Sequence, residues 1–118
     1  MLSVVLVCGD RNWTNKDKIR EVIIKHTPSL IIHGGCRGAD TLAGEVAKEL
    51  GIPVKVFPAE WDKYGKAAGP IRNQKMLDEG KPDLVIAFHN NIENSRGTKD
   101  MLYRAAKHAI PTILYTEV

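Results

Sequence analysis

Residues 30–40 read Leu30-Ile31-Ile32-His33-Gly34-Gly35-Cys36-Arg37-Gly38-Ala39-Asp40. A short apolar run is followed at once by a turn with three glycines and then, over residues 39–50, by apolar residues at helical spacing. A continuous apolar run is typical of a strand buried on both faces, and such strands belong to parallel sheets whose crossovers are helices. The stretch therefore predicts an α/β fold.

The rest of the chain repeats this pattern. Strands are predicted at residues 4–8, 30–33, 54–57, 84–88 and 112–115, and amphipathic helices at residues 15–26, 39–50, about 70–79 and 97–109. Because crossovers between parallel strands are right-handed, few topologies remain. We expect one domain over residues 1–118, with a Rossmann-like doubly wound parallel sheet of about five strands in the order 3-2-1-4-5 and helices on both faces.

Composition narrows the class of protein. The hydrophobic fraction of 43% and the charged fraction of 26% are typical of a globular domain. The apolar N-terminal run lacks a basic start, no apolar segment approaches the roughly 20 residues of a membrane span, and the two cysteines lack metal-ligand spacing. A net charge of +3 without a run of basic residues does not indicate binding to duplex DNA. We expect a cytoplasmic protein without a membrane partner or a metal.

Ligands of open parallel sheets bind beyond the carboxyl ends of the strands, where the strand order reverses. The segments predicted to meet there are residues 9–13, 33–40 and 90–98. In the second, the glycines permit close backbone approach and aim free amides at an anion, while Arg37 adds a charged donor. Asp40 and Thr41 are alternatively helix caps, and the glycines alternatively serve a tight turn only.

Two further helix beginnings also favour the binding of an anionic ligand. Ser95-Arg96-Gly97-Thr98 again joins hydroxyls, a glycine and a guanidinium, with helix capping by Ser95 or Thr98 as the alternative. Arg72 and Asn73 lie in the first turn of a predicted helix, where a cation is unfavourable and needs an anionic partner. That partner is either a ligand or an acidic side chain, Glu60 or Asp62.

Other candidate side chains have ordinary structural explanations. Trp61, Tyr64 and Trp13 are able to stack on a base, but we favour their covering the sheet edge. His33 is interpreted as a hydrogen-bonded structural residue, and Cys36 lacks an accompanying base. The glycines do not match the dinucleotide fingerprint, and the Walker pattern is missing, so no cofactor is predicted.

Four motifs in order carry a family resemblance: Val7-Cys8-Gly9-Asp10-Arg11, His33 to Asp40, Ala68-Gly69-Pro70-Ile71-Arg72-Asn73-Gln74-Lys75-Met76, and Ser95-Arg96-Gly97-Thr98. Together they resemble the YspA-like branch of the SLOG superfamily, which includes the LOG phosphoribohydrolases and the DNA-processing protein DprA. The resemblance implies a Rossmann-like fold and a nucleotide-derived ligand. Relatives are often dimers, so it also implies a homodimer as one oligomeric state of this chain.

The resemblance implies less about the reaction. Arg72 to Met76 is similar to the element that supplies a catalytic arginine in LOG enzymes, and Arg96-Gly97-Thr98 is similar to a shortened phosphate loop. The position of the LOG catalytic glutamate falls on Met101. Asp100 lies one residue earlier and, on a helix, points about 100° away.

Three hypotheses follow. The first is binding of a nucleotide-like small molecule for sensing or processing. The second is hydrolysis of an N-glycosidic bond, with Arg72, Asp10, Glu60 and Asp100 as candidate catalytic residues. The third is binding of single-stranded nucleic acid, as in DprA. The predicted ligand-binding residues are Gly9, Asp10, Arg11, His33, Gly34, Gly35, Cys36, Arg37, Gly38, Ala39, Asp40, Arg72, Asn73, Ser95, Arg96, Gly97 and Thr98.

Overall fold

The computed structural model describes residues 3–117 and contains a five-stranded sheet. Its strands are β1 (Val4–Gly9), β2 (Leu30–His33), β3 (Val54–Val56), β4 (Leu84–Phe88) and β5 (Thr112–Tyr115). All neighbouring strands are parallel, in the order β3-β2-β1-β4-β5. The predicted topology, with its reversal of strand order between β1 and β4, is confirmed.

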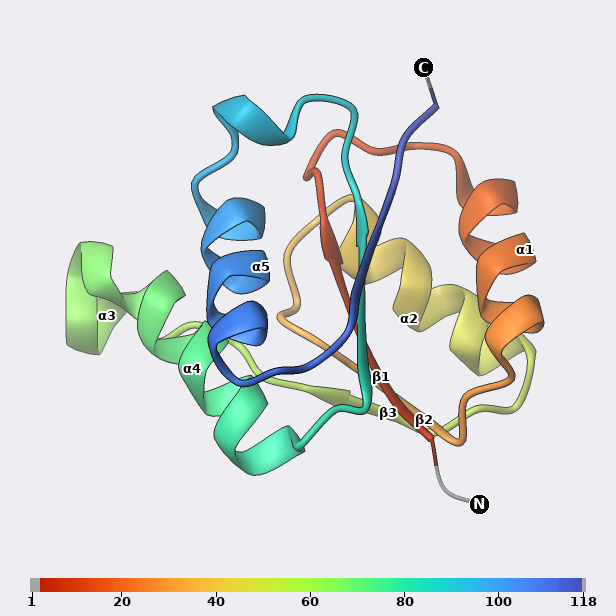
Figure 1. The fold of residues 1–118 in the computed structure, drawn as a ribbon, viewed down its shortest axis with the longest axis horizontal. Helices are drawn as coiled ribbons and strands as arrows, with labels where there is room; N and C mark the ends of the chain where they lie inside the picture. The colour runs from red at the N-terminus through yellow and green to blue at the C-terminus, as the bar shows by residue number, and fades with distance from the viewer. Residues whose placement is uncertain (1–2, 118) are drawn as a thin grey trace.

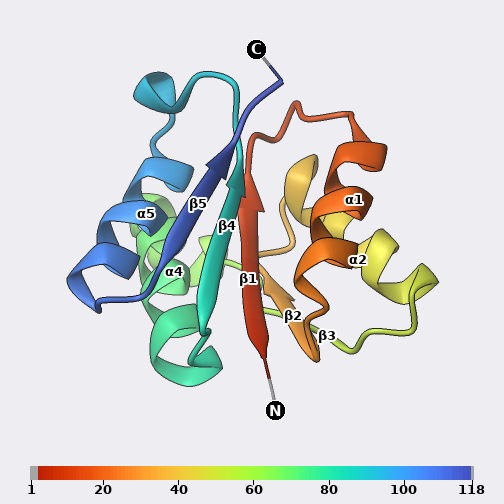
Figure 2. The same ribbon diagram turned by 45° about the vertical axis from the view of Figure 1, so that its right-hand side comes forward.

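Helices cover both faces of the sheet. The elements are α1 (Lys16–His26), α2 (Ala39–Glu49), α3 (Trp61–Tyr64), η1 (Gly65–Ala67), α4 (Ala68–Gly80), η2 (Ile92–Asn94) and α5 (Gly97–Lys107). Figures 1 and 2 show α1 and α2 on one face and α4 and α5 on the other. The doubly wound arrangement is therefore as predicted. No helix within residues 3–117 is long and apolar enough to cross a bilayer.

The core is divided by the sheet into two layers, because successive strand residues point to opposite faces. Val5, Val7 and Phe88 pack in the layer under α1 and α2, whereas Leu6, Val85 and Ala87 pack in the layer under α4 and α5. Burying one such Val, Leu or Phe side chain contributes about 1.5–3 kcal/mol. The burial of both faces of β1, β2 and β4 explains why these strands read as unbroken apolar runs, whereas the edge strands β3 and β5 are more exposed.

The strand register brings the loops at the carboxyl edge together. Gly9 is paired with Phe88 across β1 and β4, and Asp10 N donates to Phe88 O at 2.9 Å. On the other side of β1, His33 at the end of β2 is paired with Val56. The segments that follow β1, β2 and β4 therefore leave the sheet at one edge.

The aromatic residues differ from the favoured prediction. Trp13 is 3% exposed and its ring lies 5.5 Å from that of Phe88, so it belongs to the core. Trp61 and Tyr64 are exposed on α3, a single turn without a buried residue that lies at the periphery in Figure 1. The prediction that these two rings cover the sheet edge is wrong, because the sequence after β3 turns outward into α3.

Candidate functional site

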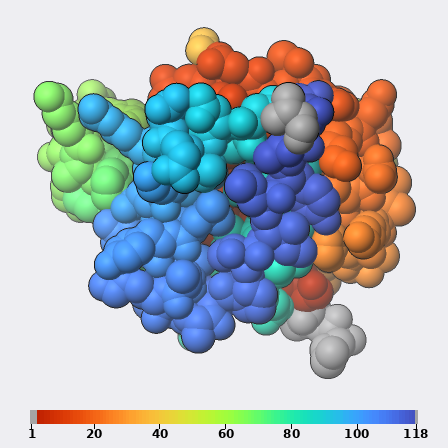
Figure 3. All heavy atoms as spheres, turned by 45° about the horizontal axis from the view of Figure 1, so that its top comes forward, coloured from red at the N-terminus to blue at the C-terminus, as the bar shows by residue number. Residues whose placement is uncertain are grey.

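The loop after β1 packs directly on the beginning of α2. Ala39 N donates to Asp10 O at 3.1 Å. Gly38 has a φ of 80°, and a Cβ at this position would overlap the backbone of Asp10 and Arg11. Only glycine tolerates both this conformation and this approach. Figure 3 looks toward this edge and shows the segment before α5 exposed between α5 and the segment that follows β1.

The β2–α2 loop satisfies much of its own hydrogen bonding. Asp40 Oδ2 accepts from Gly34 N at 3.0 Å and from Cys36 N at 3.3 Å, and Gly35 N donates to His33 Nδ1 at 3.0 Å. The prediction of free amides at these three positions, and at Ala39, is therefore wrong. An internal carboxylate occupies the place that an external anion was expected to take.

A smaller set of donors in this loop stays open. Within residues 3–117, the amides of Arg37, Gly38 and Asp40 have no protein acceptor. The Arg37 side chain is exposed, and its guanidinium donates to Asn12 Oδ1 of the β1–α1 loop at 3.2 Å. Within the described chain, the start of α2 therefore still has three unpaired amides that can donate to an anion. The neighbouring Asp40 carboxylate would repel such an anion when it is ionised.

Burial dominates the electrostatics of this loop. Asp40 is 5% exposed, and desolvation raises its pKa to about 6, while the hydrogen bond from Cys36 N and the charge of Arg72 act in the opposite direction. Burial, followed by the Arg72 charge, lowers the pKa of His33. His33 Nδ1 accepts a hydrogen bond, which fits a neutral imidazole with its proton on Nε2. His33 is therefore a structural hydrogen-bonding residue, as interpreted from the sequence.

Arg72 joins the β2–α2 loop to α4. Its Nη1 donates to Gly34 O at 2.6 Å, its Nε donates to Asn73 Oδ1 at 3.1 Å, and its Nη2 lies 3.8 Å from Cys36 Sγ. Within residues 3–117 no ion pair joins Arg72 to Glu60 or Asp62. The cation is stabilised mainly by backbone carbonyl oxygen, which neither sequence alternative anticipated.

Asn73 continues the connection to α5. It is 4% exposed, and its Nδ2 donates to Gly97 O at 3.3 Å and to Asp100 Oδ2 at 3.0 Å. A chain of hydrogen bonds therefore runs from Gly34 through Arg72 and Asn73 to Gly97. The two glycine-rich helix beginnings lie at the two ends of this chain, on the same edge of the sheet.

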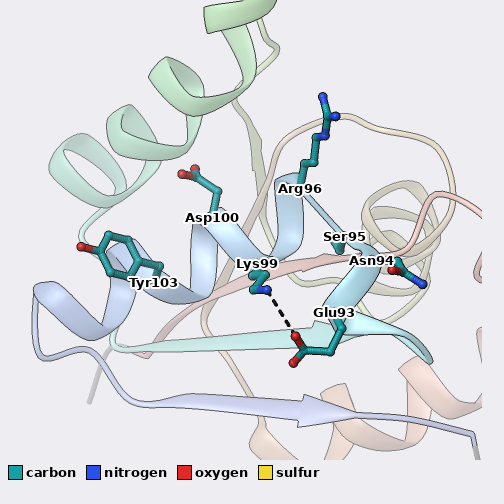
Figure 4. Close-up of a pocket in the computed structure, with 7 residues that line it drawn as sticks. All are labelled: Glu93, Asn94, Ser95, Arg96, Lys99, Asp100 and Tyr103. Atoms are coloured by element: carbon teal, nitrogen blue, oxygen red, sulfur yellow. Dashed lines mark hydrogen bonds and ion pairs between the residues drawn. The ribbon is translucent and has the colours of Figure 1, made fainter.

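Within residues 3–117, the beginning of α5 has as many unpaired amides as that of α2, and its arginine side chain is unpaired as well. Ser95 Oγ accepts from Thr98 N at 3.0 Å, as the capping alternative predicted. In the described part of the chain, the amides of Arg96, Gly97 and Lys99 have no acceptor, and the Arg96 guanidinium has no acidic partner. Arg96 and Lys99 line an open groove of about 610 Å³, together with Glu93, Asn94, Ser95, Asp100 and Tyr103 (Figure 4).

The candidate catalytic carboxylates have different surroundings. Asp100 lines the groove, and its Oδ2 also accepts from Arg104 Nε at 2.8 Å. Asp10 lies just beyond β1, where its Oδ1 accepts from Asn12 N at 2.9 Å. Glu60 is exposed and precedes α3, away from the α5 groove. Met101, at the position of the LOG glutamate, is 1% exposed in the core.

The sequence reasoning missed Tyr103 and Lys99 as groove residues. Tyr103 follows Arg96 by seven residues, which is about two helical turns, so the spacing was available as a signal that they share a face. A second hollow of about 530 Å³ lies beside α2 and is bordered by His33, Thr41, Lys48 and their neighbours. Residues 3–117 contain no group of three His, Cys, Asp or Glu side chains suited to a metal ion.

Comparison with known proteins identifies the family to which the chain belongs. The model of the "YspA, cpYpsA-related SLOG family" matches residues 3–64, just over half of the 118 residues. The Gene 61 protein of Mycobacterium phage D29 is 30% identical over 119 residues, covering 92% of this chain and 93% of that protein. The motifs around Arg72 and Arg96 lie beyond the part that the family model matches.

A solved structure shares the fold. The DNA processing protein A (DprA) of Streptococcus pneumoniae matches 96% of this chain with a TM-score of 0.75 and 18% sequence identity. The present chain spans about half of that DprA chain, covering 50% of it. The chain belongs to the YspA, cpYpsA-related SLOG family.

Proposed function

We propose that this protein binds a nucleotide or a phosphorylated nucleoside at the carboxyl edge of its sheet, with the phosphate at the beginning of α5. One observation carries the proposal. The amides of Arg96 and Lys99 and the guanidinium of Arg96 lack protein partners within residues 3–117, and both residues line the 610 Å³ groove. Unpaired amides at a helix beginning, together with an arginine, favour an anion such as phosphate.

The beginning of α5 suits a phosphate better than the beginning of α2. In the β2–α2 loop, Asp40 already accepts from two amides and would repel a second anion when ionised. The α5 groove is lined by two carboxylates, but Asp100 is paired with Arg104 and Asn73, and Glu93 is paired with Lys99. In this proposal Arg72 acts as a positioning residue, because it holds the loop through Gly34 O rather than facing the groove.

A ligand larger than inorganic phosphate fits the groove. Its volume of about 610 Å³ lies within the range of small-molecule sites, and its lining combines a cation, an unpaired carboxylate oxygen and an aromatic ring. Membership of a SLOG family supports a nucleotide-derived ligand, as the sequence resemblance implies. A homodimer stays an expectation from that resemblance and is not needed for this groove.

Isothermal titration with AMP, GMP, CMP and UMP tests the proposal. Arg96→Ala is expected to weaken binding of each bound nucleotide by about 10- to 150-fold, since hydrogen bonds to charged groups are worth about 1.5–3 kcal/mol. Lys25→Ala is the matched control, because it removes one positive charge from the exposed end of α1, on the opposite face. Binding that is absent for all four nucleotides, or equally weakened by both variants, would contradict the proposal.

N-glycosidic hydrolysis is a second candidate, and the location of Asp100 favours it. Of the three carboxylates considered from the sequence, Asp100 lies in the groove, one helical turn from Arg96. A carboxylate there is placed to organise water or assist a leaving base. Incubation with the same four nucleotides, followed by chromatography for free base, tests this function. Release that Asp100→Asn abolishes would support it, and binding without release would exclude it for these substrates.

Single-stranded nucleic acid is a third candidate ligand. Lys99, Tyr103 and Lys107 are exposed on α5, and an aromatic ring among cations is typical of surfaces that bind single strands. The shared fold with a DNA processing protein is consistent with it but, at 18% identity, carries only the fold. A gel shift with oligothymidylate at low and moderate salt tests it, because phosphate contacts weaken steeply as salt rises.

A further inference from the structure

We propose that the α5 groove holds a single ribonucleoside monophosphate lengthwise, with its phosphate at Arg96, a ribose hydroxyl at Asp100 and its base on Tyr103. This inference rests on the proposed function and assigns an orientation and a ligand class to the same site. It makes Tyr103 a base-binding residue that the family motifs do not include.

The three side chains form one line on the surface of α5. Asp100 follows Arg96 by four residues, and Tyr103 follows Asp100 by three, so they lie on one face of the helix in successive turns. Figure 4 shows Asp100 between Arg96 and Tyr103, with Lys99 turned away toward Glu93. The helical rise separates Arg96 from Tyr103 by about 10 Å along the axis, which is comparable to an extended nucleoside monophosphate.

Asp100 has one oxygen available for a ligand. Its Oδ2 accepts from Asn73 Nδ2 at 3.0 Å and from Arg104 Nε at 2.8 Å. Its Oδ1 has no donor among the described residues, and the side chain is 25% exposed. The two neighbours fix the carboxylate in place, so Oδ1 is a preorganised acceptor. Ribose hydroxyls are donors of the required kind, whereas a second phosphate at this point would meet a negative charge.

Tyr103 supplies a platform for a base. It is 63% exposed, more than any other large hydrophobic side chain among residues 3–117, and it lines the groove about two helical turns after Arg96. Lys107 Nζ lies 5.4 Å from the ring centroid, and its cation–π contact restricts the ring. Base stacking on an aromatic ring is tolerant of base identity, so AMP is an adequate probe for this contact.

Calorimetric titrations test the inference. The ligands are AMP, 2′-deoxy-AMP, 3′-deoxy-AMP and ribose 5-phosphate, and the proteins are the wild type, Tyr103→Ala and Trp61→Ala. Tyr103→Ala is expected to weaken AMP by about 5- to 150-fold, since stacking of one base is worth about 1–3 kcal/mol. It should leave ribose 5-phosphate unchanged. One of the two deoxy nucleotides should bind the wild type about tenfold more weakly than AMP, because the Asp100 hydrogen bond is lost. Trp61→Ala is the matched control, because Trp61 is 58% exposed on α3, outside the groove.

The outcomes separate this inference from the proposed function. Loss of AMP affinity in Tyr103→Ala but not in Trp61→Ala, together with discrimination against a deoxy sugar, supports the orientation. If Arg96→Ala weakens AMP while Tyr103→Ala does not, phosphate binding at α5 stands and the orientation is wrong. Equal effects of Tyr103→Ala on AMP and on ribose 5-phosphate also overturn it. If none of the phosphorylated probes binds the wild type, the proposed function and this inference fall together.

Discussion

Replacing Asp40 with asparagine tests the internal carboxylate of the β2–α2 loop. Asparagine has nearly the same shape, and its Oδ1 can accept from the amides of Gly34 and Cys36 as Asp40 Oδ2 does. What the substitution removes is the charge. Because Asp40 is 5% exposed, its ionised form is poorly solvated in the folded protein.

The size of the effect follows from the proton affinity of the carboxyl. Burial raises the pKa of Asp40 from its ordinary value of 3.8 to about 6. A difference of about two in pKa corresponds to about 3 kcal/mol. Since folding raises this pKa, the stability contributed by protonated Asp40 is fully present below pH 3.8 and is lost as pH rises through about 6. The wild type should therefore lose about 3 kcal/mol relative to Asp40→Asn across that window.

Urea unfolding of both proteins, followed by circular dichroism at several values between about pH 4 and pH 7.5, measures this difference. Arg72 acts on the pKa of Asp40, and Asp40 acts on the pKa of Cys8; both residues are present in both proteins. The two proteins therefore differ only in the carboxyl group of residue 40. A difference in unfolding free energy that does not change with pH, or that moves in favour of the wild type as pH rises, would refute the account of Asp40 as a desolvated carboxylate.

Two predictions concern other parts of the edge. Gly38→Ala should destabilise the protein by at least about 2 kcal/mol more than Gly51→Ala in the same unfolding assay. Both glycines have positive φ, but only a Cβ at Gly38 meets neighbouring backbone. Equal losses of stability in the two variants would contradict the packing described for the β1–α1 loop. A thiol reagent should modify one cysteine in the native protein, since Cys36 is exposed whereas burial raises the pKa of Cys8. Rapid modification of Cys8 without unfolding would contradict its position in the core.

Much of the fold could be predicted from the sequence because its signals are local. The ends of β2, β4 and β5 are confirmed without change, and each is an apolar run that stops at a polar or glycine-rich turn. Asn15 was included in the predicted first helix and is its N-cap, since Asn15 Oδ1 accepts from Lys18 N. The short helices α3, η1 and η2 were not predicted, because one turn is too short to show a helical period.

The candidate site was predictable only in outline. The residue types around Gly34, Arg72 and Gly97 predicted that these three residues lie at one edge of the sheet. The structure joins them through a single chain of hydrogen bonds. The sequence did not reveal that Asp40 accepts hydrogen bonds from the amides of Gly34 and Cys36, nor that Tyr103 borders the groove. A carboxylate six residues after Gly34 reads equally well as a helix cap or as a ligand contact.

The sequence by itself determined the α/β class, the strand order and the edge of the sheet at which the glycine-rich loops meet, because hydrophobic periodicity and glycine turns act over neighbouring residues. The tertiary structure decided which of the polar groups at that edge remain open. Arg72 meets a carbonyl 38 residues away and Asn73 meets one 24 residues away. Whether a buried donor has a partner depends on such distant contacts, and burial in turn sets the proton affinity of Asp40.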